Sequence, residues 1–432
     1  MKSALRPFES SSRFHDFIGY EKFTRWVVAG GGALILVVVL LCGLVSPAAH
    51  AQTFTTLYNF AGPPDGADPY GGVIRDADGN LYGTTYQGGY LSCKDAYHPY
   101  GCGTVFKVSV DGSETVLHLF TGGTADGEFP FGTVLRDEDG TLYGATGAGG
   151  MGGCSTTWGE LGCGVVFKID AAGNESILYN FQGGTKDGCY PAQGLVMDKC
   201  GYLYGTTQGC GATNNGTVFK LSKNGKEVLL HSFSGGDGGN PSYGKLLLAD
   251  NGDLYGVTSG QSTTESCGTL YRVTRKGKFT LLHVFGEAGD GCFPMGTPGM
   301  DASGNIYGTT AEGGNPGVSG TIWKLDERNA KVETVLHSFH GGSGDGEYPE
   351  AGVVLDPKGN VYGNTATGGW YGLGTLWELT KDGEFTLLYS FSNGNWIMGD
   401  VLRDDRGLLS GTTAGGGTYG YGTVWSYKKC ER

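Results

Sequence analysis

The sequence predicts an all-β fold, a seven-bladed β-propeller of four-stranded blades. A block of about fifty residues recurs seven times after the first fifty positions. Each block contains four short runs that are rich in β-branched and aromatic residues, and no stretch after residue 52 shows helical periodicity. One supersecondary unit is therefore packed on copies of itself, and four strands per unit match a propeller blade.

The motifs of one repeat predict four strands per blade, named A to D from the inside outward. The fullest copy reads Gly-Thr-Val-Leu-Arg-Asp (132–137), Leu-Tyr-Gly-Ala-Thr (142–146), Gly-Val-Val-Phe-Lys-Ile (164–169) and Ile-Leu-Tyr-Asn-Phe (177–181). Strand B recurs at Tyr82, Tyr143, Tyr204, Tyr255, Tyr307 and Tyr362, with Ser410 in the last copy. Strand C opens at Gly103, Gly164, Gly216, Gly268, Gly320, Gly374 and Gly422, so both series indicate seven blades.

The two ends of the repeat array complete each other. The first D run, at 53–60, precedes any A, B or C run, and the last C run, at 422–427, has no D run after it. We therefore expect the N-terminal strand to pair with the C-terminal blade, which closes the ring and leaves no open sheet edge.

Residues 1–51 are typical of an export signal. Five basic residues precede an apolar run over 26–45, and small residues follow up to Ala51, which predicts cleavage before Gln52. The apolar run is also long enough to span a bilayer, so an uncleaved N-terminal membrane anchor stays open as an alternative. In either case we expect an exported protein, either secreted, periplasmic or at the cell surface, with the propeller over residues 52–432.

The body of the protein is strongly acidic. The formal net charge is −13, and loss of residues 1–51, which carry five basic and three acidic groups, makes it −15. This charge repels phosphate backbones and anionic lipids, so we expect no nucleic acid partner and no membrane contact apart from the N-terminal segment.

The cysteines predict disulfides, because ten of the 11 remain after the signal in an exported chain. Two pairs share one spacing just before strand C, and a third joins a similar position to the next D-to-A loop: Cys93 with Cys102, Cys154 with Cys163, and Cys267 with Cys292. The pairing of Cys189, Cys200, Cys210 and Cys430 stays open, with Cys189 to Cys210 as one option.

The repeat resembles a known family. The segments Gly-Asn-Leu-Tyr-Gly-Thr-Thr (79–85), Gly-Thr-Val-Phe-Lys (216–220), Val-Leu-His-Ser-Phe (335–339) and Asp-Gly-Glu-Tyr-Pro (345–349) are similar to the GloVer tandem repeat, named for Gloeobacter and Verrucomicrobia. Strands A and B, as in 352–362, are also similar to NHL-type propeller repeats. The resemblance implies a propeller in an exported bacterial protein, and it implies no particular activity.

The two faces of the predicted ring differ. The A-to-B turns follow the pattern Asp-x-x-Gly-Asn, as at 76–80 and 301–305, and we interpret them as turns capped by the Asp side chain. A calcium loop is the alternative, but the oxygen ligands do not continue and no glutamate closes the loop. The D-to-A and B-to-C loops form the other face, and insertions at 86–102 and 147–163 place the variation there.

This loop-rich face is the predicted binding surface. Its B-to-C loops carry aromatic and histidine side chains, which suit a glycan or a protein partner. The candidate binding residues are Tyr97, His98, Tyr100, Trp158, Trp370 and Tyr371. The alternative is that these rings only pack the loops onto the blades.

Six D-to-A loops contain Asp-Gly, and we expect their carboxylates near the mouth of the central channel. Asp126 and Asp187, in neighbouring loops, join the candidate binding residues because carboxylates bind sugar hydroxyls or a cation. The alternative is that Asp-Gly only makes the turn.

No catalytic motif is evident, and the sequence predicts neither a cofactor nor a metal site. His118, His231, His283 and His337 share one position in strand D that is Tyr in other blades, which indicates a structural role. We therefore expect a monomer that binds a glycan or an envelope protein without evident catalytic machinery. Two other hypotheses are a polysaccharide lyase or hydrolase with its site at the channel mouth, and a structural spacer of the cell envelope.

Overall fold

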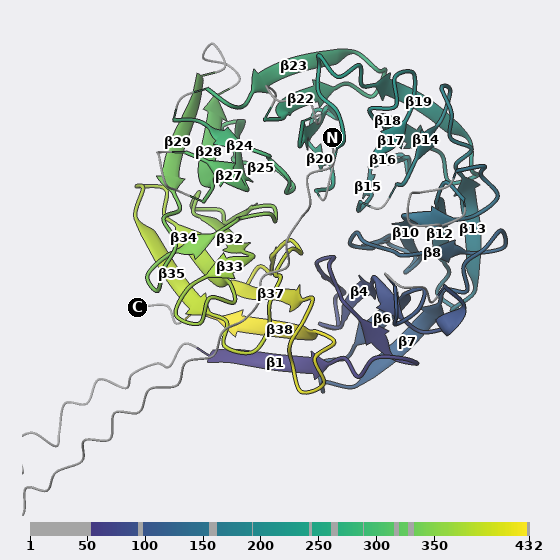
Figure 1. Ribbon diagram of the computed structural model, residues 1–432, viewed down its shortest axis with the longest axis horizontal. Coiled ribbons are helices and arrows are strands. Elements are labelled where there is room, and N and C mark those ends of the chain that lie inside the picture. The colour runs from purple at the N-terminus through teal and green to yellow at the C-terminus, as the bar shows by residue number, and fades with distance from the viewer. Residues whose placement is uncertain are drawn as a thin grey trace, which may run out of the picture. The chain divides into compact units, whose positions relative to one another are not determined.

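Seven antiparallel sheets surround a central axis in the computed structural model (Figure 1). The structure describes residues 53–93, 98–154, 162–191, 193–241, 244–260, 267–287, 289–314, 319–326 and 332–429. Residues 52–432 form one compact unit. Each sheet has four strands in the order A, B, C, D, so the predicted seven-bladed propeller is confirmed.

The two inner strands of each blade differ in length. The innermost, strand A, pairs over two residues: β3 (Ile74–Arg75), β9 (Leu135–Arg136), β15 (Val196–Met197), β20 (Leu247–Leu248), β25 (Gly299–Met300), β31 (Val354–Leu355) and β36 (Leu402–Arg403). Strand B is longer: β4 (Leu81–Thr85), β10 (Leu142–Thr146), β16 (Leu203–Thr207), β21 (Leu254–Thr258), β26 (Asn305–Thr310), β32 (Val361–Thr365) and β37 (Leu408–Thr413).

The two outer strands complete each blade, and blades 1 to 7 follow chain order. Strand C is β6 (Thr104–Val108), β12 (Val165–Ile169), β18 (Thr217–Leu221), β22 (Thr269–Val273), β28 (Thr321–Asp326), β34 (Thr375–Leu379) and β38 (Thr423–Lys428). The outermost, strand D, is β7 (Glu114–Leu119), β13 (Glu175–Asn180), β19 (Glu227–Ser232), β23 (Phe279–Val284), β29 (Val332–Ser338), β35 (Phe385–Ser390) and, in blade 7, β1 (Thr53–Asn59).

The N-terminal strand closes the ring as predicted. Strand β1 pairs antiparallel with β38, from Thr53 opposite Lys428 to Asn59 opposite Thr423. In Figure 1 the purple β1 lies beside the yellow β38. The first and last segments of the propeller therefore share one sheet, which closes the ring.

An aromatic pair seals every boundary between blades. A Phe at the end of one strand D meets an aromatic residue on strand C of the next blade, with ring centroids 5.0–6.0 Å apart. The seven pairs are Phe60–Phe106, Phe120–Phe167, Phe181–Phe219, Phe233–Tyr271, Phe285–Trp323, Phe339–Trp377 and Phe391–Trp425. All are buried, and such a pair contributes about 1 kcal/mol beyond its area burial.

The glycine of the Leu-Tyr-Gly motif makes room for these rings. Gly205 on β16 lies opposite Phe219 on β18. A Cβ on Gly205 would lie 2.6 Å from the Phe219 ring, which is too close for any other residue. The motif is therefore a packing requirement.

The loops confirm how the two faces were assigned. On the loop-rich face, the D-to-A and B-to-C loops pair through two-residue ladders: β2 (Gly66–Ala67) with β5 (Gln87–Gly88), β8 (Gly127–Glu128) with β11 (Ala148–Gly149), β14 (Gly188–Cys189) with β17 (Gly209–Cys210), β24 (Gly291–Cys292) with β27 (Glu312–Gly313), and β30 (Gly346–Glu347) with β33 (Thr367–Gly368). The described residues include one short 3₁₀ helix, η1 (Leu91–Cys93), and none of their helices is long and apolar enough to cross a membrane. The predicted signal or anchor, 1–51, lies outside the described residues.

On the opposite face, which we call the turn face, the predicted Asp cap is present. Asp301 accepts hydrogen bonds from the N–H groups of Ser303 (2.8 Å) and Asn305 (2.9 Å) and from the Tyr307 hydroxyl (3.1 Å). Burial acts to raise the pKa of Asp301, but the hydrogen bonds from Asn305 and Tyr307 outweigh it and lower the pKa. The equivalent Asp–Tyr bond joins Asp76 to Tyr82, Asp137 to Tyr143, Asp198 to Tyr204 and Asp356 to Tyr362.

Candidate functional site

The Asp-Gly aspartates cap their own turns. Asp126 accepts hydrogen bonds from the N–H groups of Thr121 (2.8 Å) and Gly127 (2.7 Å), and its Oδ2 lies 3.3 Å from Nε2 of His118. Burial acts to raise the pKa of Asp126, but the bonds with His118 and Thr121 outweigh it and lower the pKa.

Asp187 is held in the same way, by Gln182 N–H (2.7 Å), Gly188 N–H (2.7 Å) and the Tyr179 hydroxyl (3.1 Å). The His or Tyr partner belongs to strand D, the outermost strand of the blade. The expectation that these carboxylates approach the channel mouth is therefore wrong, because strand D holds them over the outer part of the blade. The turn interpretation describes them correctly.

A ring of seven residues with positive φ surrounds the channel mouth instead. One residue per blade, just before strand A, adopts a φ of 51–62° although none is glycine: Asp68, Phe129, Tyr190, Asn240, Phe293, Tyr348 and Trp396. Such a conformation is unfavourable for an L-residue and needs support from its surroundings. The backbone is the same in all blades, whereas the side chain ranges from Asp to Trp.

Backbone hydrogen bonds supply this support. The Tyr348 N–H donates to the carbonyl of Ser319 (3.0 Å), and the Tyr348 carbonyl accepts from the N–H of Ala366 (2.9 Å). In all seven blades the carbonyl of the positive-φ residue accepts a hydrogen bond from the N–H of the residue that follows strand B. The side chain takes no part in these bonds, so it is free to vary.

A hollow of about 680 Å³ opens inside this ring of residues. Aromatic side chains from blades 1, 2, 6 and 7 line it, together with Glu312 and Glu350. The aromatic residues are Tyr70, Tyr86, Phe131, Tyr348 and Trp396. Tyr70 stacks on Phe131 with ring centroids 5.0 Å apart, and Trp396 is 55% exposed. This hollow, which we call the channel-mouth cup, presents ring faces and carboxyl groups to a ligand.

Burial changes the acidity of two carboxyl groups on this face. It raises the pKa of Glu350, which lines the cup. It also raises the pKa of Asp68, in the ring of positive-φ residues, to about 6. The Gln87 amide donates a hydrogen bond to Asp68 (2.9 Å). Both groups therefore hold a proton more readily than an exposed carboxyl group does.

The cup narrows toward the middle of the ring. Below Tyr70, Phe131 and Met398 a space of only about 10 Å³ remains. Backbones of neighbouring blades meet there, since a Cβ on Gly71 would lie 2.9 Å from the Gly132 carbonyl carbon. Little free space therefore remains beside this wall of the cup.

The predicted binding residues that the structure describes lie outside the cup. His98 is buried and packs on Phe129, with ring centroids 4.1 Å apart. This contact fits the alternative interpretation, in which the loop rings pack onto the blades. Tyr100 is at the surface with its ring edge against Tyr421. Trp370 is 73% exposed and Tyr371 is also exposed. Tyr97 and Trp158 lie outside the described residues.

The cup residues were missed although their signal was present. The motif Asp-Gly-x-x-Pro draws attention to its constant positions. Tyr348, just before the proline, and Tyr70, just after the equivalent proline of blade 1, are the positions that enter the cup.

Four disulfides are present. They join Cys93 to Cys102, Cys154 to Cys163, Cys267 to Cys292, and Cys189 to Cys210. The three predicted pairs are thus found, and the open option of Cys189 with Cys210 is the fourth. Cys200 is unpaired and exposed, and Cys430 lies outside the described residues.

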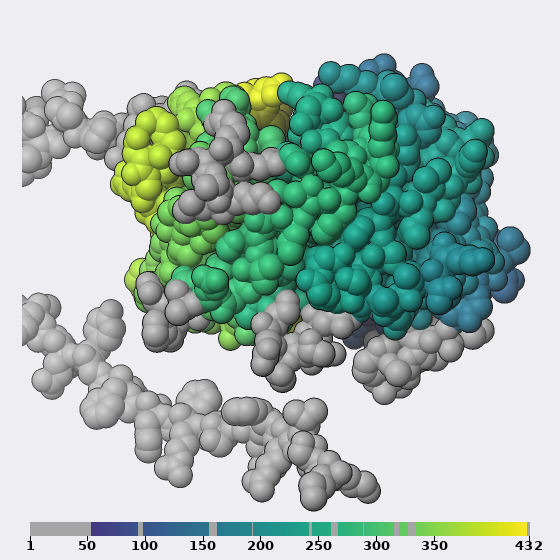
Figure 2. All heavy atoms as spheres, turned by 90° about the horizontal axis from the view of Figure 1, so that it is seen from above, coloured from purple at the N-terminus to yellow at the C-terminus, as the bar shows by residue number. Residues whose placement is uncertain are grey.

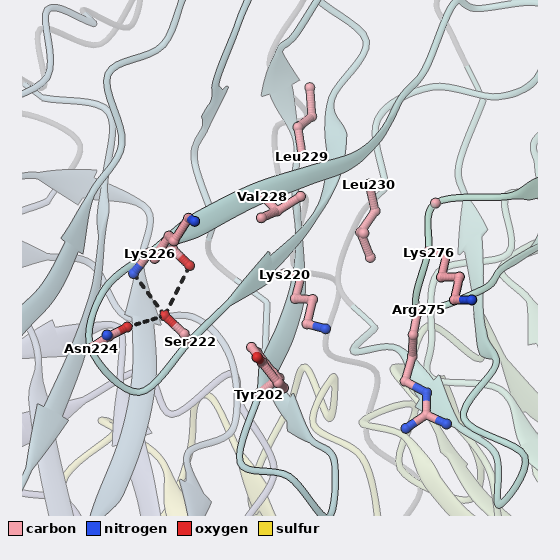
Figure 3. A pocket seen from close by; sticks show the side chains of 11 residues that line it. Tyr202, Lys220, Ser222, Asn224, Lys226, Val228, Leu229, Leu230, Arg275 and Lys276 are labelled. Carbon is pink, nitrogen blue, oxygen red and sulfur yellow. Dashed lines mark hydrogen bonds between the residues drawn. The ribbon is translucent and has the colours of Figure 1, made fainter.

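A second hollow lies on the turn face between blades 3 and 4 (Figure 3). It has a volume of about 550 Å³ and a basic lining that includes Lys220, Lys226, Arg275 and Lys276. The Lys220 ammonium lies 3.7 Å from the centroid of the Tyr202 ring. This basic groove suits an anionic group, whereas the channel-mouth cup suits a sugar or another polar ring.

Fold and sequence together define the chain as a tandem-repeat β-propeller. The chain belongs to the Gloeobacter/Verrucomicrobia repeat family, whose model matches residues 43–158, 99–314 and 243–431. A comparison with curated proteins finds no match.

Solved structures with a similar fold share little sequence. A crystal structure of puromycin hydrolase has a TM-score of 0.51 at 12% identity, over 79% of this chain and 49% of that chain. PorZ, described as an essential surface component of the type-IX secretion system of Porphyromonas gingivalis, has a TM-score of 0.49 at 17% identity, over 84% of this chain and 47% of that chain. The chain spans about half the length of both. At 12% identity, the likeness to puromycin hydrolase shows the fold alone.

Proposed function

We propose that the protein is exported and binds a glycan in the channel-mouth cup. The four disulfides support export, because such bonds persist in oxidising compartments. The resemblance to exported repeat proteins points the same way.

The observation that carries the binding proposal is the set of aromatic side chains around one hollow. The faces of Tyr348 and Trp396 suit stacking against the C–H faces of a sugar, while the carboxyl groups of Glu312 and Glu350 accept hydrogen bonds from its hydroxyls. A volume of about 680 Å³ fits a short stretch of glycan. A protein partner would need a wider and flatter surface than this cup.

A binding assay of the purified protein against a panel of neutral and acidic glycans tests this proposal. We expect Trp396→Ala to weaken binding by at least about tenfold with little change in Tm, since the exposed ring supports no core packing. Trp370→Ala is the matched control, because this exposed tryptophan lies outside the cup.

The opposite result would place the site elsewhere. If Trp370→Ala loses binding and Trp396→Ala keeps it, the site would lie in the B-to-C loops. An acidic glycan that binds both variants equally would point to the basic groove. Failure to bind any glycan or envelope protein would favour a structural spacer.

A second candidate function is glycan cleavage in the same cup. The supporting observation is that Glu312 and Glu350 both line it and that burial raises the pKa of Glu350. Glycosidases use one protonated and one ionised carboxyl group. If the protein cleaves its ligand, Glu350→Gln should abolish the product detected by mass spectrometry while retaining binding. Retention without product in the unmodified protein would leave the binding function alone.

A further inference from the structure

The outer rim repeats one contact at the boundaries between blades. A residue near the start of each strand D reaches the His or Tyr near the end of the preceding strand D. Three boundaries place a Phe there: Phe279 stacks on His231 at 3.9 Å, Phe385 on His337 at 3.9 Å and Phe54 on Tyr389 at 4.1 Å. The equivalent residue in the other four is Glu114, Glu175, Glu227 or Glu333.

Two boundaries combine this Glu with a His and with the Asp that caps the turn. His118, Asp126 and Glu175 meet between blades 1 and 2, and His283, Asp290 and Glu333 meet between blades 4 and 5. In each trio one ligand atom per residue lies within 4.8 Å of the other two. The Glu comes from the next repeat, so no local spacing in the sequence reveals the trio.

The atoms already have the spacing of metal ligands. His118 Nε2 lies 3.3 Å from Asp126 Oδ2, and His283 Nε2 lies 3.0 Å from Asp290 Oδ2. A cation bonded at about 2.1 Å to both atoms would hold them about 3.0–3.4 Å apart in octahedral or tetrahedral geometry. The Asp side chains are more than nine-tenths buried, and the His side chains are four-fifths buried.

The glutamates supply an oxygen without a partner. Glu175 Oε1 and Glu333 Oε1 are buried and receive no hydrogen bond from any described residue. A buried carboxylate oxygen without a donor is unfavourable, and a bound cation would satisfy it. The same is true of Glu114 and Glu227, where the neighbour is Tyr58 or Tyr179. The imidazole therefore distinguishes the two trios from these boundaries.

We propose that each of these two rim trios binds one divalent transition-metal cation, which links the outer strands of two neighbouring blades. One imidazole nitrogen and two carboxylates form a donor set suited to Zn²⁺ or Mn²⁺. The rim has no open gap between blades 3, 4 and 5 in side view (Figure 2). The cation would thus tie together blades that already touch. These sites go beyond the glycan function, and the sequence alone predicts no metal.

The test is the number of Zn²⁺ ions held per chain after equilibrium dialysis of the purified protein. The background protein carries Cys200→Ser, because the free Cys200 thiol would also bind zinc, and Cys430→Ser, so that no thiol at position 430 contributes to the count. We expect two ions in this background, one in either Glu175→Gln or Glu333→Gln, and none in the double variant. Glu114→Gln is the matched control and should keep two, because its boundary lacks a histidine.

A gain of function makes the test sharper. Phe279→Glu would place a carboxylate beside His231 and Asp237, whose Nε2 and Oδ2 are 3.0 Å apart, and should raise the count to three. Zinc should raise the Tm of the background protein and not that of the double variant. Two ions retained by a folded double variant, or none held by the background protein, would overturn the proposal. If Phe279→Glu does not fold, the loss variants still decide.

Discussion

The turn face and the loop-rich face are built from the same seven repeats but use them differently. On the turn face the recurring bond joins two side chains of one blade, as in Asp301 with Tyr307, so the bond depends on both residues. On the loop-rich face the positive-φ residue is held through its own N–H and C=O groups, as in Tyr348, so its side chain is not constrained.

This difference explains where a repeat protein can acquire a ligand site. Variation at these positions leaves the backbone bonds intact, and two of the seven side chains, Tyr348 and Trp396, line the cup. Blade 7 lacks the tyrosine that forms this bond on the turn face. Ser410 replaces the tyrosine there, and Arg75 from blade 1 donates a hydrogen bond to Ser410 (2.7 Å). A missing side chain on that face is compensated by another.

The largest expected effect is on the turn face. Asp301→Ala should lower the free energy of unfolding by about 2 kcal/mol, because it leaves the donors of Ser303, Asn305 and Tyr307 without their acceptor. Denaturant unfolding measures this loss of free energy. The control is Trp370→Ala on the loop-rich face, whose free energy of unfolding should stay within about 0.5 kcal/mol of that of the unmodified protein. Equal losses in the two variants would contradict the proposed difference between the faces.

A smaller effect is a dependence of stability on pH at the rim. Burial and the nearby negative charge of Asp65 raise the pKa of Glu114 to about 7. Burial and the charge of Asp187 do the same for Glu227. The folded state therefore binds these protons more tightly than the unfolded state, and their contribution is lost as pH rises through about 7. Between pH 5 and pH 8 the unfolding free energy should fall by about 1 kcal/mol per glutamate, after allowance for solvent screening.

Glutamine variants check the origin of this pH dependence. Glu114→Gln should remove the share of the slope between pH 5 and pH 8 that belongs to Glu114, whereas an unchanged slope would assign the pH dependence to other groups. The turn face should respond in the opposite direction. The lowered pKa of Asp301 means that its contribution is present above the usual Asp pKa and is lost on acidification.

The smallest effect concerns the positive-φ ring. Tyr348→Gly should be more stable than Tyr348→Ala by about 1 kcal/mol, because glycine adopts a φ of 54° without strain and alanine does not. Thermal or denaturant unfolding of the pair measures this difference. A more stable alanine variant would mean that the surroundings select the side chain as well as the backbone, and the contrast between the faces would weaken.

The sequence by itself determined the blade count, the strand order and the closure of the ring. Seven strand B motifs, six with Tyr and one with Ser410 before the glycine, and seven strand C glycines count the blades, and the unpaired first D run identifies the closing strand. These features are local or periodic, so they can be recognised from the sequence alone. The disulfides Cys93–Cys102 and Cys154–Cys163 were equally legible, because each pair lies within one loop.

Only the tertiary structure decided which side chains meet. Tyr70 and Trp396 lie at opposite ends of the repeat array and line one cup because the ring closes between blades 7 and 1. Asp126 lies near the rim because His118 on strand D is its partner, which no spacing rule indicates. Likewise, Glu175 reaches the preceding blade through a contact between outer strands. Contacts between repeats depend on how the blades pack around the axis, and the motif of a single repeat carries no record of that packing.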